Sequence, residues 1–197
     1  MTELKILYIN LDLRKDRREH IEKLLCDMPN LERVSAIKDE RGGYYGCVRS
    51  HILCLKIALA RRYESVIILE DDFKYKDNRR LATMDIPPAG EYDMLLLSNL
   101  VIDKDTVSHD DKFDRVFKAQ WTSGYLIHQN FYQKLIDIFE ESLKKLYEDY
   151  SRCNYIDIYW NKIFKDSLIL KHKKIIGTQL ENNFSDIKGC VFNRSTW

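Results

Sequence analysis

Short apolar runs separated by polar segments recur along the chain and indicate its fold. The clearest run covers residues 65–69, where Val66, Ile67 and Ile68 are β-branched and Leu69 follows them. An apolar run of this length without alternation is typical of a strand that is buried on both faces of a sheet. Further runs predict strands over residues 4–9, 31–37, 92–98, 115–119, 125–128 and 168–177.

Between these runs, apolar residues recur at helical spacing. Residues 14–28 place Ile21, Leu24, Leu25 and Met28 on one face and charged residues elsewhere, which predicts an amphipathic helix. Similar patterns predict helices over residues 47–62, 131–150 and 154–165, and loops over residues 38–46 and 74–91. The order β-α-β-α-β in the first third predicts a parallel sheet with right-handed crossovers.

Composition describes one globular domain over residues 1–197, since 45% of the residues are hydrophobic. Thirty-two basic residues against 31 acidic ones leave a net charge of +1, so no nucleic-acid partner is expected. No apolar run is long enough for a transmembrane segment, and the N-terminal residues lack the features of a signal peptide. The expected location is therefore the cytoplasm, and the composition leaves the oligomeric state open.

Five cysteines are present, with no CxxC pair among them. In a chain with no visible export signal, this pattern favours free, buried thiols in a reducing compartment. The residues concerned are Cys26, Cys47, Cys54, Cys153 and Cys190.

Three acids follow the central apolar run directly: Glu70, Asp71 and Asp72. Unpaired carboxylates are too costly to continue into the core, so the strand is expected to deliver them to the carboxyl edge of the sheet. Open α/β folds bind ligands at that edge, and Mg²⁺ and Mn²⁺ prefer carboxylate oxygens that they share with substrate phosphates. The triplet therefore predicts a metal–phosphate site, with a solvated turn of ordinary surface acids as an equally weighted alternative.

The first predicted helix begins with a cluster of cations formed by Arg14, Lys15, Arg17 and Arg18. Cations at a helix N-terminus oppose the macrodipole, which indicates either that they serve an anion or that they form a solvated basic face. The preceding strand and turn contain no GxGxxG, so a dinucleotide fingerprint is absent.

Five short segments occur in an order and at spacings that resemble one known family. They are YINLD at 8–12 with Arg17, RVSA at 33–36, GCVRSH at 46–51, LEDD at 69–72 and TSGY at 122–125. Together they resemble the family 25 glycosyltransferases of lipopolysaccharide and collagen glycosylation. The resemblance is weakest over residues 74–112 and near the C-terminus, which are the regions that would select an acceptor.

This resemblance implies a GT-A-like α/β fold, in which a Rossmann-like, mixed and mostly parallel sheet is flanked by helices. It implies transfer of a hexose from a nucleotide-diphosphate donor, with UDP as the expected nucleotide, to a glycan or protein acceptor with inversion. Mn²⁺ or Mg²⁺ is the implied cofactor. Residues 1–100 would form the donor half and residues 101–197 the acceptor half.

The same resemblance assigns roles to individual residues. Asp72 is the implied direct metal ligand together with Glu70, while Glu70 or Asp71 would hold the ribose or a metal-bound water. The implied donor-binding positions are Asn10, Leu11, Arg17, Ala36, Ser50, Glu70, Asp71, Gly124 and Tyr125.

Two residues are implied to act in catalysis. Asp157 would be the base that takes the acceptor proton, although it also suits a helix N-terminus without any catalytic role. His51 would bind, orient or exchange a proton, although a helical histidine is more often a structural hydrogen-bonding residue. Tyr159 and Trp160 are expected either to stack on sugars or to belong to the core.

Two late residues complete the set of candidates. Asp186 is a weaker candidate for a metal or donor contact, and His172 is expected at the surface.

Other classes of function remain as alternatives. A receiver-like binding module would explain the run into Asp71 and Asp72, but Ser98 occupies the place of its phospho-acceptor. A metal-dependent phosphatase would need a nucleophilic carboxylate where Asn10 stands. A non-catalytic nucleotide-sugar-binding protein with the same fold is the remaining alternative.

Overall fold

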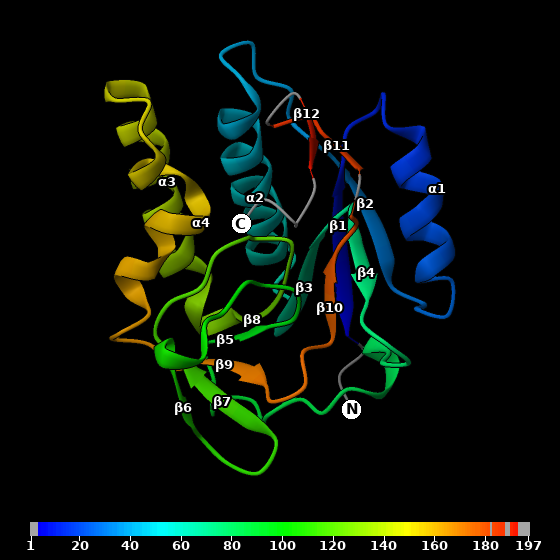
Figure 1. Cartoon of the computed structure of the whole chain (residues 1–197), viewed down its shortest axis with the longest axis vertical. Coiled ribbons are helices and arrows are strands. Elements are labelled where there is room, and N and C mark those ends of the chain that lie inside the picture. The colour runs from blue at the N-terminus through cyan, green and yellow to red at the C-terminus, as the bar shows by residue number, and fades with distance from the viewer. Residues whose placement is uncertain (1–3, 182, 188–189, 193–197) are drawn as a thin grey trace.

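One mixed sheet forms the centre of the computed structural model, which describes residues 4–181, 183–187 and 190–192 (Figure 1). Its strand order is β2-β1-β3-β8-β5-β9-β7-β6. Strands β7 and β8 run opposite to the other six. The predicted parallel arrangement of the first three strands is confirmed, since β1 pairs in parallel with both β2 and β3. The strands of this sheet are β1 (Lys5–Asn10), β2 (Leu31–Ser35), β3 (Ser65–Glu70), β5 (Met94–Leu96), β6 (Thr106–Ser108), β7 (Phe113–Val116), β8 (Gly124–His128) and β9 (Ile169–His172).

Two small antiparallel pairs and four α-helices complete the described structure. One pair joins β4 (Phe73–Tyr75) to β10 (Gly177–Gln179), and the other joins β11 (Asn183–Ser185) to β12 (Cys190–Phe192). The helices are α1 (Lys15–Leu24), α2 (Gly43–Ala60), α3 (Tyr132–Glu148) and α4 (Ile156–Tyr159). None of the helices in the described part of the chain is long and apolar enough to cross a membrane.

Helices cover both faces of the sheet, as the unbroken apolar run of β3 predicts. Val66 and Ile68 belong to the core layer shared with α2 and α3, whereas Ile67 and Leu69 belong to the layer shared with α1. Figure 1 shows α1 on one side of the sheet and α2, α3 and α4 on the other. Because helices cover both faces of β3, this strand reaches an open edge of the sheet only at its polar end.

Helix α2 packs closely on the loop that follows β2, and a glycine makes this approach possible. A Cβ atom on Gly46 would lie 2.3 Å from the carbonyl oxygen of Ile37. Ser50, one turn later, fixes the same contact because its hydroxyl donates to the Gly46 carbonyl at 2.7 Å and accepts from the Ile37 N–H at 2.8 Å. The start of α2 is thus held against the end of β2 beside the carboxyl edge of the sheet.

Gly46→Ala is expected to destabilise the protein by about 1–3 kcal/mol, because a backbone oxygen must move to admit the methyl group. Helix propensity alone predicts the opposite sign, a gain of about 1 kcal/mol for this replacement inside a helix. Urea unfolding of the two proteins distinguishes the two effects. If Gly46→Ala were as stable as the wild type, the loop after β2 would move to admit the methyl group without any loss of stability.

Several predicted boundaries need correction. The loop predicted over 38–46 is shorter, since α2 begins at Gly43, and the helix predicted over 154–165 is α4 flanked by 3-10 turns. Sequence analysis missed the strands β4, β6, β10, β11 and β12, each of which has three residues. So few residues show no periodicity, and their pairing partners in the other strand are distant in sequence.

Two predictions about exposure are wrong. His172 is buried at the end of β9, with its ring centroid 4.9 Å from that of Phe113, and is not a surface residue. Cys26 and Cys153 are exposed, whereas Cys54 is buried as predicted. The described cysteines are free, and the side chain of Cys190 lies outside the described residues.

Candidate active site

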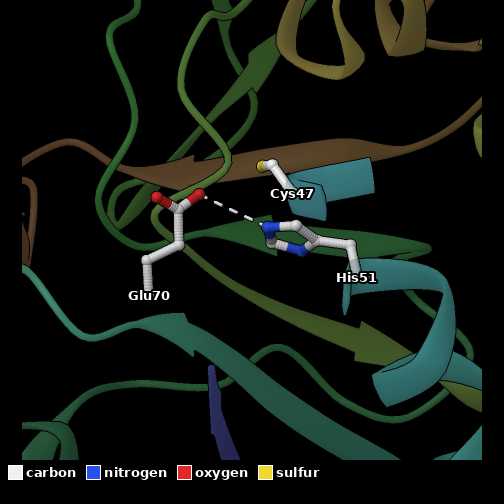
Figure 2. Close-up of side chains that lie close together, drawn as sticks. All are labelled: Cys47, His51 and Glu70. Atoms are coloured by element: carbon white, nitrogen blue, oxygen red, sulfur yellow. Dashed lines mark hydrogen bonds and ion pairs between the residues drawn. The ribbon is translucent and has the colours of Figure 1, made fainter. Parts of the chain in front are cut away.

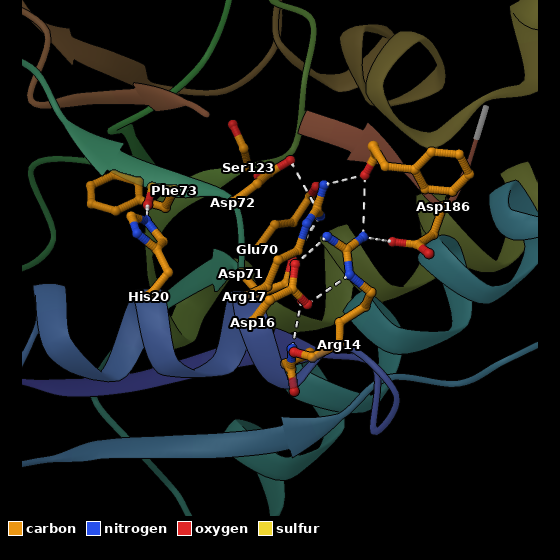
Figure 3. Close-up of polar contacts among 12 residues, drawn as sticks. Arg14, Asp16, Arg17, His20, Glu70, Asp71, Asp72, Phe73, Ser123 and Asp186 are labelled. Carbon is orange, nitrogen blue, oxygen red and sulfur yellow. Dashed lines mark hydrogen bonds and ion pairs between the residues drawn. The ribbon is translucent and has the colours of Figure 1, made fainter. Parts of the chain in front are cut away.

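The acid triplet lies at the carboxyl edge of the sheet, where β1 and β3 end side by side. Glu70 is the last residue of β3 and pairs with Ile9, one residue before the end of β1. The strand ends at Glu70, and Asp71 and Asp72 form the turn before β4, so the three acids have different neighbours. Figure 3 shows Arg17 of α1 beside these acids, whereas Arg14, which precedes α1, lies between Asp16 and Asp186.

Asp71 is fixed by two donors and supports the arrangement of the edge. Its Oδ2 accepts from Nδ2 of Asn10 at 2.7 Å, and its Oδ1 accepts from Nη1 of Arg17 at 2.9 Å. Asn10 is itself held by Arg33, whose Nε donates to Oδ1 of Asn10 at 3.0 Å. Burial raises the pKa of Asp71, and Arg17 and Asn10 offset part of that effect.

Arg17 also links the acids to the β11–β12 hairpin. Its Nη2 donates to the carbonyl oxygen of Phe184 at 2.7 Å, and Arg14 donates to the same oxygen at 3.2 Å. Arg14 forms an ion pair with Asp186, the weaker candidate from the sequence. Arg17 therefore contacts both the acids and the hairpin, Arg14 contacts the hairpin, and Arg18 is exposed.

Asp72 differs from Asp71 because nothing in the described structure satisfies one of its oxygens. Its Oδ1 is buried and accepts no hydrogen bond from any described residue, and its Oδ2 lies 3.7 Å from Nη1 of Arg17. Burial and the charge of Glu70 raise the pKa of Asp72 far above its usual range. A buried oxygen without a partner is costly, and a cation or a donor group at Oδ1 of Asp72 would remove that cost.

Glu70 faces α2 and is held in its charged form. Its Oε1 accepts from the Thr122 hydroxyl at 2.8 Å and lies 3.3 Å from Nε2 of His51 (Figure 2). Burial alone would raise the pKa of Glu70, but the contacts with His51 and Thr122 outweigh it and lower that pKa. Nδ1 of His51 lies 3.0 Å from the Tyr125 hydroxyl, which completes a buried chain of polar groups.

A thiol stands beside this pair. Figure 2 shows Cys47 one helical turn before His51, and the ligand atoms of Cys47, His51 and Glu70 lie within 4.8 Å of one another. A thiol with an imidazole suits zinc better than magnesium, which prefers oxygen ligands. Burial raises the pKa of the Cys47 thiol, so the group is expected to be protonated in the absence of a cation.

Thr122→Val is expected to destabilise the protein by about 1–3 kcal/mol near pH 7, because a buried carboxylate loses one of its donors. The lowered pKa of Glu70 gives stability that is present above its unfolded value of about 4.3 and is lost as the pH falls. The difference between variant and wild type should therefore shrink below pH 4 in urea unfolding experiments.

Thr106→Val is the matched control for this experiment, since the Thr106 hydroxyl donates to the uncharged carbonyl of Asp103 at 2.8 Å. The destabilisation caused by Thr106→Val should not shrink below pH 4. An equal pH dependence in both variants would contradict the role given to Thr122.

The predicted base, Asp157, lies in α4 and is joined to the acids through the segment before β8. Its Oδ2 accepts from the backbone N–H of Trp121 at 3.2 Å, and the backbone of Trp121 has a positive φ of 64°. In the same segment, the Ser123 carbonyl accepts from the Glu70 N–H at 3.0 Å. Burial raises the pKa of Asp157, and the charge of Glu70 adds to this effect despite the Trp121 N–H.

The other predicted donor residues lie around or behind this edge. Ser50 and Tyr125 are fully buried behind His51, and Gly124 lies inside the sheet between Leu69 and Ser98. Leu11 and Ala36 are half-buried at the ends of β1 and β2, where the Ala36 N–H donates to the Asn10 carbonyl at 2.9 Å.

Tyr159 and Trp160 belong to the core, which was one of the two alternatives for them. Sequence analysis assigned no role to Arg33, Trp121 or Thr122, although Arg33 and Thr122 lie inside segments that carry the family resemblance.

Comparison with known proteins adds the family. Residues 41–151, more than half of the chain, match the family described as glycosyltransferase family 25 (LPS biosynthesis protein). The chain belongs to glycosyltransferase family 25. The predicted family and the predicted class of enzyme, a glycosyltransferase, are thereby confirmed. No match was found among curated protein sequences.

Solved structures resemble this glycosyltransferase in fold. A mannose-1-phosphate geranyltransferase from Thermus thermophilus has 11% identity over 89% of this chain and 75% of its own, with a TM-score of 0.54. A glycosyltransferase involved in glycosylation of the major capsid of PBCV-1 has 10% identity over 86% of this chain and 92% of its own, with a TM-score of 0.47. The likeness to the geranyltransferase, with its TM-score above 0.5, confirms the predicted GT-A-like fold class.

Proposed function

We propose that this family 25 enzyme transfers a hexose from a UDP-sugar to a hydroxyl group of a glycan or glycoprotein, with a divalent metal and with inversion. The observation that carries the proposal is the orphaned, buried Oδ1 of Asp72 beside two further acids. Among the described residues, Arg17 is the one cation in contact with Asp71 and Asp72, so a single guanidinium faces two carboxyl groups.

The residues present suit Mn²⁺ or Mg²⁺, because the unsatisfied ligand atom is a carboxylate oxygen. Asp72 would hold the ion, with Glu70 as the second acid. When bound, the ion would neutralise charge on the leaving nucleoside diphosphate. Glu70 is restrained by Thr122 and His51, so its carboxylate needs little reorganisation when the donor binds.

The donor would lie over the ends of β1 and β2. Arg17 offers a guanidinium that can form paired hydrogen bonds with a diphosphate, and Asp71 and Asn10 fix its position. Leu11 and Ala36 would border the nucleotide. Ser50, Gly124 and Tyr125 would act from behind, by holding α2 and β8 in place.

Asp157 would act as the general base. It takes the proton of the acceptor hydroxyl while that oxygen forms a bond to the anomeric carbon, and the bond from that carbon to the diphosphate breaks with its electrons leaving on the nucleotide. His51 is fully buried, so we assign it as a positioning residue that holds Glu70 rather than as a group that touches the sugar.

Nucleotide release from a panel of UDP-, GDP- and TDP-sugars tests the proposal, with Mn²⁺ or a chelator present. Slow hydrolysis of a UDP-hexose is expected in the wild type, and its loss is expected with chelator and in Asp72→Asn. Asp103→Asn, an exposed acid away from the site, is the control. The anomeric configuration of the product, measured by NMR, tests inversion.

Two results would contradict the proposal. Failure of every nucleotide-sugar to bind or to stabilise the protein would remove the donor site. Binding without any turnover, and function unchanged in Asp157→Asn, would instead indicate a non-catalytic nucleotide-sugar-binding protein.

A further inference from the structure

Five tyrosines gather where α2 begins and α3 ends. Tyr44 and Tyr45 lie in the first turn of α2, Tyr147 in the last turn of α3, Tyr150 just after α3, and Tyr155 directly before α4. Figure 1 shows this end of α2 and α3 at the same end of the molecule as the β11–β12 hairpin, which contacts the acid site. We call these five residues the tyrosine cluster.

The rings of the tyrosine cluster form one connected surface. Tyr44 stacks on Tyr155 with ring centroids 3.6 Å apart, and Tyr45 stacks on Tyr147 at 5.2 Å and on Tyr150 at 5.8 Å. Tyr150 also meets Tyr44 edge to face at 6.0 Å. The surface is therefore continuous from α3 to the residue that precedes α4.

Part of the tyrosine cluster is anchored and part is open. Tyr45 is buried, and its hydroxyl donates to the carbonyl of Leu146 at 2.9 Å. Tyr147 and Tyr150 are 46% and 55% exposed, and the guanidinium of Arg41 lies 4.7 Å from the Tyr147 ring. Single exposed aromatic residues are common, whereas a rigid and contiguous group of them marks a binding surface.

The tyrosine cluster leads directly to the predicted base. Tyr155 is two residues before Asp157, and Tyr44 is close enough to Asp157 and Cys47 for their charges to influence its pKa, which burial raises. A molecule lying on these rings would therefore have one end near the group proposed to accept the proton.

We propose that the tyrosine cluster binds the acceptor as a glycan, holding the sugar rings next to the one whose hydroxyl is glycosylated. The direction in which the glycan lies rests on the proposed function, in which Asp157 is the base. The binding of a glycan to the tyrosine cluster does not rest on it. A pyranose has an apolar C–H face and a rim of hydroxyl groups. Tyrosine offers a rigid ring for the face and a phenolic oxygen for the rim at little entropic cost.

A carbohydrate fits this surface better than an apolar peptide or a lipid. The exposed members of the cluster each carry a hydroxyl, and Arg41 adds hydrogen-bond donors at the edge. Aliphatic side chains or acyl chains would offer no hydrogen-bond partners to these hydroxyl groups. The occupant inferred from this chemistry is therefore an oligosaccharide.

Direct binding to glycans tests the proposal without a donor. The intact protein would be applied to an array of glucose-, galactose- and mannose-based oligosaccharides, and the strongest binder titrated by calorimetry. Tyr150→Ala is expected to weaken binding about tenfold or more, as truncation of a central aromatic residue does at an interface. Tyr150→Phe, which keeps the ring, should retain most of the affinity.

Leu59→Ala is the control, because Leu59 is similarly exposed but lies at the opposite end of α2. The affinity of Leu59→Ala for the glycan should equal that of the wild type. Thermal unfolding of all variants measures any loss of folded protein. If Tyr150 had only a structural role, Tyr150→Ala would contain less folded protein, but the folded part would bind the glycan with the affinity of the wild type.

Two results would overturn the proposal: no glycan retained by the wild type, or equal glycan affinities of the wild type and Tyr150→Ala. Donor hydrolysis is measured on the same proteins and should be unchanged in Tyr150→Ala. Absence of donor hydrolysis by the wild type would instead contradict the proposed function. The experiment therefore separates failure of glycan binding from failure of the proposed function.

Discussion

Asp157→Asn is expected to lower kcat for sugar transfer by about 100- to 10,000-fold, the range in which general base catalysis contributes. The substituted amide keeps an oxygen that can accept the Trp121 N–H, so the segment before β8 should remain in place. Because the residue is proposed to act on the acceptor proton, binding of the donor should change little. Initial rates with a glycan acceptor, together with donor titrations, measure the two effects separately.

The pH dependence gives this prediction a second readout. Burial raises the pKa of Asp157, and only the ionised carboxylate can accept a proton. Transfer by the wild type should therefore increase with pH as Asp157 loses its proton, at a higher pH than an exposed aspartate would show. The residual rate of Asp157→Asn should lack this rise.

Asp103→Asn serves as the control for a general loss of negative charge, and it should show the wild-type rate and profile. A variant Asp157→Asn that transfers sugar at the wild-type rate would show that another group takes the proton. In that case the hydrogen bond between Asp157 and the Trp121 N–H would have a structural role only.

The first half of the fold could be predicted because its elements are long and regular. β1, α1, β2, α2 and β3 each carry a full apolar pattern, and their alternation determines a parallel arrangement. The reversed strand β8 enters the sheet between β3 and β5, which no local pattern indicates. Pairing between strands distant in sequence depends on packing of the whole domain.

The acids were predictable for the same reason, but the direction of each was not. Glu70 turns toward α2, Asp71 toward Asn10 and Arg17, and Asp72 keeps an unsatisfied oxygen. These differences come from neighbours that lie 19 to 61 positions away. The sequence therefore predicted that the acids lie at the carboxyl edge of the sheet, whereas the structure separates an acid with two donors from one that keeps an oxygen without a partner.

Trp121 and the tyrosine cluster show what sequence analysis could not find. The cluster combines residues from α2, α3 and the segment before α4, and none of these pieces forms a motif alone. Trp121 contributes through its backbone N–H and its positive φ, which the identity of a tryptophan does not predict. Both features lie on the side of the site where Asp157 stands.

Asp72→Asn is expected to abolish metal-dependent hydrolysis of the donor and, at the same time, to stabilise the unliganded protein at pH 8. Ionising Asp72 places a charge near Glu70 and leaves a buried oxygen without a donor. The amide removes that charge at nearly the same size. A gain of at least about 1 kcal/mol should raise Tm by about 2–4 °C for a chain of this length.

The sign of this effect depends on pH. Because the folded state raises the pKa of Asp72 above its unfolded value of about 3.9, the neutral form favours folding. That contribution is complete below the unfolded value and is lost as the pH rises toward the folded one. The difference in Tm between Asp72→Asn and the wild type should therefore be small near pH 4 and largest near pH 8.

Mn²⁺ should reverse the order of the two proteins at pH 8. A cation that binds Asp72 offsets the charge that destabilises the wild type, so the Tm of the wild type should rise with the concentration of Mn²⁺. Asp72→Asn has no carboxylate to receive the ion and should not respond, and Asp103→Asn should behave as the wild type does. If Asp72→Asn were less stable than the wild type at pH 8 without metal, the carboxylate would be satisfied within the protein, and the argument for a cation at this position would fail.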